Sequence, residues 1–277
     1  KIYVLPGTYA EIVDIDKGVV IHSDVERLGN PAYRDSTIID ANGSQGFVMN
    51  DISGNHNVEI SGFVIKDANF SSANDGGAFR FNNNYNTDVT ISNVKVEDAG
   101  NNGYGFHAFV MANNISSLRI IESNFINSGS QNDNRYPFGF NNIGLVEIQS
   151  VEVRDVGFAQ WLFQIANVSQ FKMENSIITE LEFDWSDKAI FKLQDVSTIF
   201  QHVSFWNNQF GDESRIFDFD GSNVDLFVTN SILESGTSEI LILSKDYTIS
   251  NSIIGSSLGG NGQNLGSGNV FADPQLN

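Results

Sequence analysis

The chain has 277 residues, and its 15 Lys and Arg against 34 Asp and Glu give a net charge of −19. This balance argues against nucleic acid and against an anionic membrane surface as partners, since both require a basic face. No run of about 18 apolar residues is present, so the sequence predicts no membrane-spanning helix and no membrane insertion. The absence of cysteine excludes disulfide bonds and bounds little else.

Residues 1–57 are expected to form the N-terminal coils. The segment from Lys1 to Ile21 predicts two strands around the turn 5–9, which reads Leu-Pro-Gly-Thr-Tyr. Residues 24–36 are polar and contain Pro31, so we expect a loop there, followed by a return to strand at 37–40. The chain begins directly in a strand-like segment, and we expect it to be a mature or trimmed part of a longer polypeptide.

A five-residue pattern led by Phe then recurs through most of the chain. Each copy has an apolar residue two positions later and ends in an amide or a turn former. The interval between copies ranges from 23 residues (217 to 240) to 32 residues (47 to 79). The leading positions are Phe47, Phe79, Phe109, Phe138, Phe163, Phe191, Phe217 and, more weakly, Ile240.

A second alternating pattern lies between the Phe copies. Each copy of this second pattern starts on an apolar residue and has another apolar residue seven positions later. The copies begin at Val58, Val89, Leu118, Val146, Phe171, Ile199, Leu226 and Tyr247. Segments this short, rich in Val, Ile and Phe and separated by Gly, Asn, Asp and Ser, predict strands rather than helices.

Two or three strands per period of about 25 residues predict an all-β, right-handed parallel β-helix of about nine to ten coils. A leucine-rich repeat is the rival solenoid, but the Leu spacing and helical half-repeat that it needs are not visible. We expect one domain over 1–277, with regular coils at 58–255 and a Gly-rich tail or cap at 256–277.

Several short motifs resemble the pectin-lyase-like β-helix superfamily. They are the Leu-Pro-Gly-Thr-Tyr turn, the Asn-Ser-Ile steps at 230–232 and 251–253, and the closing Asn-Val-Phe-Ala-Asp-Pro at 269–274. The chain is most similar to uncharacterised secreted β-helix proteins of Bacteroidetes, which are distantly related to chondroitinase B and the alginate lyases. The resemblance covers nearly the whole chain. It implies an extracellular or cell-surface location.

That group of lyases uses a Lys base and an Arg on adjacent coils, with carboxylates that hold calcium. By resemblance, Lys192 or Lys188 would be the base and Arg215 the clamp for a substrate carboxylate. The pair is half matched, because the slot one coil after Lys192 holds Asp218 rather than Arg. From coil spacing alone, we expect Lys192 and Asp218 to form a cross-coil ion pair.

Three aromatic residues precede successive Phe copies by two positions: His107, Tyr136 and Trp161. Long loops at 69–77, 100–106 and 128–136 reach the same corner. Aromatic faces at coil spacing suit sugar rings, and Arg side chains nearby suit carboxylates or sulfates. The predicted glycan-binding set also contains Arg80, Arg135 and Arg215. The alternative is that the rings stack on one another to close the corner.

Oxygen-bearing residues recur at one turn and could hold Ca²⁺, with Asp67, Asp98 and Asp155 as the metal candidates. The alternative is that these residues bond their own backbone, as Asx residues at turns commonly do, and we expect no other cofactor. The column continues through Asn127, Glu180 and Asn208. A second column, Asn83, Asn113, Asn142 and Asn167, is interpreted as a structural ladder.

The outward slot after each Phe reads Val48, Arg80, Val110, Gly139, Gln164, Lys192 and Asp218.

The outward face of the second strand becomes apolar in the late coils, at Ile177, Phe200, Phe205, Phe227, Ile232 and Ile253. A face this apolar predicts a cover by the tail, another domain or another subunit, with Phe200, Phe205, Phe227 and Ile232 as the contacts. The alternative is a slip of register, since Gln201 falls in a core slot.

These observations lead to the hypothesis of a polysaccharide-binding β-helix without catalysis. The first alternative is a polysaccharide lyase that acts on an acidic, uronate-containing glycan. The second is a structural stalk or adhesin that docks through the apolar late face.

Overall fold

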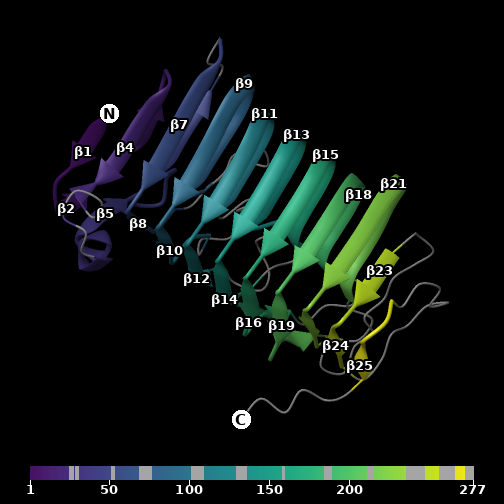
Figure 1. Cartoon of the computed structure of the whole chain (residues 1–277). Helices are drawn as coiled ribbons and strands as arrows, with labels where there is room; N and C mark the ends of the chain where they lie inside the picture. The colour runs from purple at the N-terminus through teal and green to yellow at the C-terminus, as the bar shows by residue number, and fades with distance from the viewer. Residues whose placement is uncertain are drawn as a thin grey trace.

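A computed structural model shows a parallel β-helix in which successive coils stack side by side (Figure 1), as predicted. The structure describes residues 1–24, 28, 31–50, 54–68, 77–100, 109–128, 136–157, 160–183, 189–210, 215–234, 247–255 and 266–271. In the described part of the chain, no helix is long and apolar enough to cross a membrane.

The first sheet follows the order β1-β4-β7-β9-β11-β13-β15-β18-β21-β23, with β6 pairing both β3 and β9. All of its described pairings are parallel. The bounds are β1 Ile2–Val4, β3 Val13–Ile15, β4 Val19–Ser23, β6 Phe47–Asn50, β7 His56–Ser61, β9 Phe79–Ser92, β11 Val110–Ile121, β13 Phe138–Gln149, β15 Trp161–Glu174, β18 Ala189–Gln201, β21 Arg215–Thr229 and β23 Tyr247–Ser250.

The second sheet follows β2-β5-β8-β10-β12-β14-β16-β19-β22-β24-β25, and a small third sheet pairs β17 with β20. The last strand, β25, lies within the predicted tail. The bounds are β2 Gly7–Tyr9, β5 Thr37–Asp40, β8 Val64–Lys66, β10 Lys95–Glu97, β12 Asn124–Ser128, β14 Glu152–Val156, β16 Ile177–Thr179, β17 Glu182–Phe183, β19 Ser204–Trp206, β20 Gln209–Phe210, β22 Ile232–Leu233, β24 Ile253–Ile254 and β25 Val270–Phe271.

Two details of the prediction change. Within the predicted loop at 24–36, a 3₁₀ helix covers Pro31–Ser36. The Phe segment and the second segment of each regular coil form one long, bent strand instead of two separate strands. Six coils have such a strand (β9, β11, β13, β15, β18 and β21), and the coils at either end are built from short strands. The prediction of about nine to ten coils for the whole solenoid is therefore slightly too high for regular coils.

The bend in each long strand lies at a residue with positive φ, a conformation that Asn, Asp and Gly adopt most readily. Along the coils this position is held by Asn83, Asn114, Asn142, Asn167, Asp195 and Gly221. The predicted Asn ladder is confirmed at Asn83, Asn114 and Asn142, whose side-chain amides bond from coil to coil. Two details are corrected: Asn114 rather than Asn113 holds the bend, and Asn167 bonds Asn141 instead of Asn142.

The core is a stack of Phe rings between neighbouring coils. Phe163 lies 4.4 Å from Phe138 and 4.8 Å from Phe191, measured between ring centroids, with nearly parallel planes. All three rings are buried. Because each coil buries its apolar face only against its neighbours, this stack links the stability of one coil to the next.

The predicted register is wrong by one residue in two coils. Phe79 pairs with Val110 rather than Phe109, so Met111 takes the outward slot assigned to Val110. Phe171 pairs with Thr198 rather than Ile199. The cause of the second error is a shorter bend: Ala166 and Gln170 are four residues apart, whereas their partners Gln194 and Ser197 are three apart.

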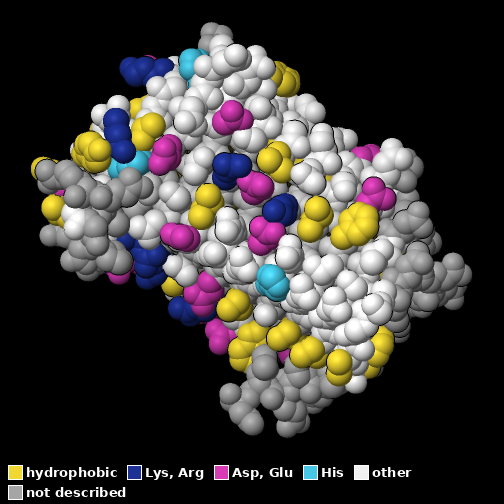
Figure 2. Space-filling view, in the orientation of Figure 1, with side chains coloured by type: hydrophobic (Ala, Val, Ile, Leu, Met, Phe, Trp, Pro, Cys, Tyr) yellow, Lys and Arg dark blue, Asp and Glu magenta, His cyan; other side chains and the backbone are white. Residues whose placement is uncertain are grey.

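The one-residue difference in register at Thr198 changes which side chains form the predicted apolar face. Phe200 and Phe205 point into the core and are fully buried, so neither is available to a partner. Ile177 and Phe227 remain 44% and 46% exposed, and Ile232 and Ile253 are half-buried. Figure 2 shows hydrophobic side chains gathered along the second-sheet strands of the C-terminal half.

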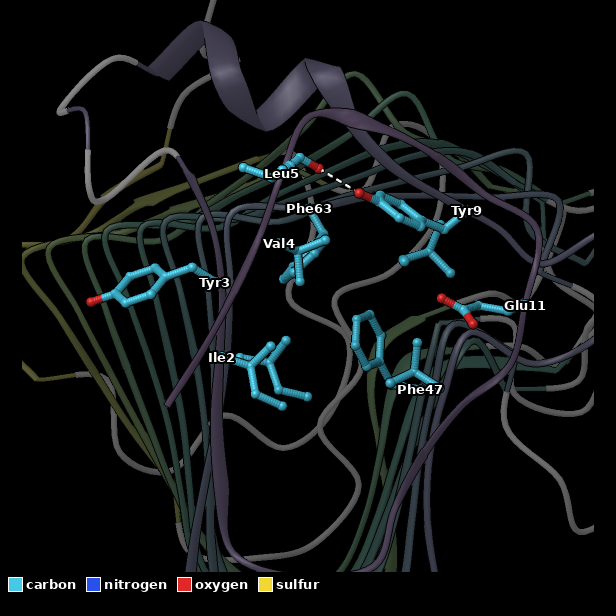
Figure 3. A pocket seen from close by; sticks show the side chains of 11 residues that line it. Ile2, Tyr3, Val4, Leu5, Tyr9, Glu11, Phe47 and Phe63 are labelled. Carbon is cyan, nitrogen blue, oxygen red and sulfur yellow. Dashed lines mark hydrogen bonds between the residues drawn. The ribbon is translucent and has the colours of Figure 1, made fainter.

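The N-terminal end of the solenoid is open. A pocket of about 400 Å³ reaches the core between β1, β2 and β3, with Ile2, Tyr9 and Phe47 in its wall (Figure 3). The Tyr9 hydroxyl donates a hydrogen bond of 2.9 Å to the Leu5 carbonyl oxygen, which fixes the first turn. The lining is mostly apolar and belongs to the exposed end of the core.

Candidate functional site

The predicted aromatic corner is present, but its rings face one another. Tyr136 and Trp161 stack with their centroids 5.1 Å apart and their planes 9° from parallel. The Tyr136 hydroxyl donates a hydrogen bond of 2.9 Å to the side-chain oxygen of Gln160. The alternative interpretation, that the rings close the corner, therefore describes this pair.

The next coil places a cation over Trp161. The ammonium nitrogen of Lys192 lies 4.2 Å from the ring centre, within the range of a cation–π contact. Tyr136 comes from the coil before Trp161 and Lys192 from the coil after it, so neighbours from both sides contact the indole. A sugar therefore has little access to the faces of Trp161.

Two ion pairs surround this corner. Lys192 Nζ lies 3.2 Å from an Asp220 carboxylate oxygen, and Arg215 lies 3.6 Å from Asp218. The predicted register of Lys192 opposite Asp218 is confirmed, but the predicted ion pair between them is wrong. Asp218 faces Arg215 on its own strand, and Lys192 reaches Asp220 instead.

Among the other predicted glycan-binding residues, Arg80 does not join this corner. Arg80 is on β9, four coils from Lys192, which corresponds to roughly 19 Å at about 4.8 Å per coil. His107, Arg135 and Lys188 lie outside the described residues. The structure thus brings together Tyr136, Trp161, Lys192 and Arg215, and it separates them from Arg80.

The proposed calcium column forms turns. Asp67, Asp98 and Asp155 all have positive φ, and Asn207 rather than Asn208 continues the column. Burial, together with the charges of Glu97 and Asp67, raises the pKa of Asp98. In the described ranges, no group of three or more His, Asp or Glu side chains is arranged to hold a metal ion, and calcium binding stays a prediction.

A groove that the sequence interpretation missed lies on the outer face of β11, β13, β15 and β18. Its volume is about 380 Å³. The middle parts of two outward columns line it. The smallest residues of these columns are Gly139 on β13 and Ala166 on β15, which lie diagonally to each other. The columns read Arg80, Met111, Gly139, Gln164, Lys192 and Asp218, and Asn82, Asn113, Asn141, Ala166, Gln194 and Asp220.

Amide side chains form a hydrogen-bonded ladder along one side of this groove. The Asn113 amide donates to Asn82, Asn141 donates to Asn113, and Asn167 donates to Asn141, at 3.0 to 3.3 Å. Asn167 supplies the amide for the coil in which the column itself holds Ala166. Gln164 lines the opposite side, one coil before Lys192.

A signal for this groove was present in the sequence. Gly139 already stood in the predicted outward slot, where a missing side chain leaves a hollow between Arg80 and Lys192. Ala166 carries no such signal, because its place in the second outward column follows only from the register between coils.

Comparison of the chain with protein-family models, with curated proteins and with solved structures finds no match.

Proposed function

We propose that the protein binds polysaccharide along the outer face of its long strands, without catalysis. The observation that carries the proposal is the groove over β11, β13, β15 and β18, which is open to solvent and lined by amide side chains. Ligand sites are typically concave and place a few polar groups among apolar ones. Met111 supplies apolar surface here, while Asn113, Asn141 and Gln164 supply hydrogen-bonding groups.

The groove also suits a chain-like ligand. Its lining repeats from coil to coil at a spacing of about 4.8 Å, so similar contacts recur along the solenoid axis. We further propose membership in the pectin-lyase-like superfamily and an extracellular or cell-surface location, on the strength of the motifs at 5–9 and 269–274.

Lyase activity is the second candidate, favoured by the positions of Lys192 on β18 and Arg215 on the adjacent strand β21, each of which pairs with a carboxylate of β21. Lys192 must be neutral to act as a general base. Its contacts with Asp220 and Trp161 are those of a charged ammonium. The third candidate, a stalk or adhesin, would use the exposed late face at Ile177 and Phe227.

The test is affinity electrophoresis through gels that contain single polysaccharides, run beside an ultraviolet assay for unsaturated uronate products. We expect retardation without new absorbance. Gly139→Gln fills the groove and should abolish retardation, whereas Thr90→Gln, on the outer face of β9 away from the groove, should leave it unchanged. New absorbance that disappears in Lys192→Ala would establish the lyase, and no retardation by any glycan would refute the proposal.

A further inference from the structure

We propose that the ligand of this groove is an uncharged polysaccharide, whose hydroxyl groups are read by the unused hydrogen-bonding capacity of the amide ladder. This inference rests on the proposed function and specifies its ligand class.

The first argument is the charge of the groove. Its described lining consists of amides, Met, Phe, Ala and Gly, and it includes no Asp, Glu, Lys, Arg or His. The chain as a whole carries a net charge of −19. An anionic polymer would therefore approach an acidic protein and find no cation in the described walls of the groove.

The second argument is the state of the cations at the groove's edge. Lys192 is paired with Asp220, and Arg215 with Asp218. The two positive charges are thus matched by two carboxylates. A ligand carboxylate that sought Lys192 would have to displace Asp220, and it would gain only the difference between two similar ion pairs.

The third argument is the number of hydrogen-bonding groups that the amides of the ladder leave unused. A side-chain amide has two N–H donors and an oxygen with two lone pairs. Asn113 and Asn141 each use one N–H to donate along the ladder and one lone pair to accept. Within the described residues, each therefore retains one donor and one acceptor.

This pairing of donor and acceptor distinguishes between ligands. A hydroxyl group both donates and accepts, so hydroxyl groups can pair with the remaining donor and the remaining acceptor of one amide. A carboxylate or sulfate only accepts, and the amide oxygen beside it would be left without a donor, at the cost of an unmade hydrogen bond. The ladder thus favours neutral sugars over uronates.

The experiment measures dissociation constants for two sets of soluble polysaccharides, neutral (glucan, mannan and galactan) and acidic (alginate, pectate and chondroitin sulfate), at low and high salt. We expect a neutral glycan to bind with an affinity that salt leaves unchanged, since no ion pair is made. Gln164→Ala should weaken binding roughly threefold to tenfold, as the loss of one hydrogen bond predicts. Thr90→Ala is the matched control and should bind like the native protein.

The outcomes separate the two proposals. Binding of acidic glycans alone, weakened by salt, would overturn the uncharged-ligand inference and leave polysaccharide binding intact. Binding of a neutral glycan that is insensitive to both Gln164→Ala and Gly139→Gln would place the site elsewhere and would overturn the inference. No binding to either set would overturn the proposed function together with the inference.

Discussion

Lys192 places its ammonium 4.2 Å from the centre of the Trp161 ring, and Tyr136 stacks on the same ring from the preceding coil. Three successive coils thus meet at one corner through an aromatic pair and a cation. The sequence left two interpretations of Trp161 open, a platform for sugar and a ring that closes the corner, and this arrangement favours the second.

The corner predicts coupled effects on stability. Trp161→Ala should lower the free energy of unfolding by about 3 kcal/mol, and Lys192→Met by less. In a double-mutant cycle the two changes should be non-additive by about 0.5 to 2 kcal/mol, because each removes the same cation–π contact. Urea denaturation of the four proteins measures this. Additive effects would show that the contact contributes nothing.

The register correction can be tested with two Phe residues that the sequence assigned to one exposed face. Phe200 is fully buried, with ring centroids 4.9 Å from Phe191 and 5.2 Å from Phe217. Phe200→Ala should therefore destabilise the protein by about 3 to 5 kcal/mol. Phe227→Ala, at a position 46% exposed, should cost less than about 1 kcal/mol. Equal losses in urea denaturation would contradict the register described above.

The bend position predicts an unusual preference for glycine. Asn142 has a φ of 56°, and its amide donates a hydrogen bond to Asn114. Asn142→Gly loses the hydrogen bond, but glycine adopts a positive φ without strain. Asn142→Ala loses the same hydrogen bond and also has the strain of a left-handed backbone conformation, about 1 kcal/mol. We expect the Ala variant to be the less stable of the two in thermal unfolding. An Ala variant as stable as the Gly variant would rule out backbone strain at this bend.

The second sheet contains a half-buried carboxylate, Glu97, that is held by two lysines. Burial by itself raises the pKa of Glu97, but hydrogen bonds and charges from Lys66 and Lys95 outweigh it, and the net shift is downward. The Glu97 side chain is 13% exposed and lies 2.6 Å from Lys66 Nζ. A lowered pKa in the folded state means that this carboxylate stabilises the fold above its unfolded pKa.

Glu97→Gln should therefore reduce stability near neutral pH by about 1 kcal/mol, a figure that allows for solvent screening of the lysines. The difference from the native protein should shrink as pH falls through the lowered pKa, because the native carboxyl then also becomes neutral. Urea denaturation at several pH values measures this. Glu152→Gln, which removes an exposed pair with Arg154, is the control and should change stability little at any pH.

The sequence predicts features that depend on residues close together in the chain better than features that depend on contacts between coils. The Phe repeat and the second repeat predicted a parallel β-helix, since side-chain alternation and turn residues are local properties of each segment. The Asn ladder followed in the same way, because the bend needs a residue that tolerates positive φ. Gly139 was likewise placed correctly in an outward slot.

Register and side-chain pairing were decided only in three dimensions. One fewer residue in the bend between Gln194 and Ser197 reverses which side chains face inward, and this moved Phe200 and Phe205 from the surface to the core. The sequence placed Lys192 opposite Asp218, but the reach of long side chains selected Asp220 as its ion-pair partner. The groove depends on Gly139 and Ala166 lying diagonally on adjacent coils, with Gly139 opposite Gln164 and Ala166 opposite Asn141, a relation that exists only once the coils are stacked.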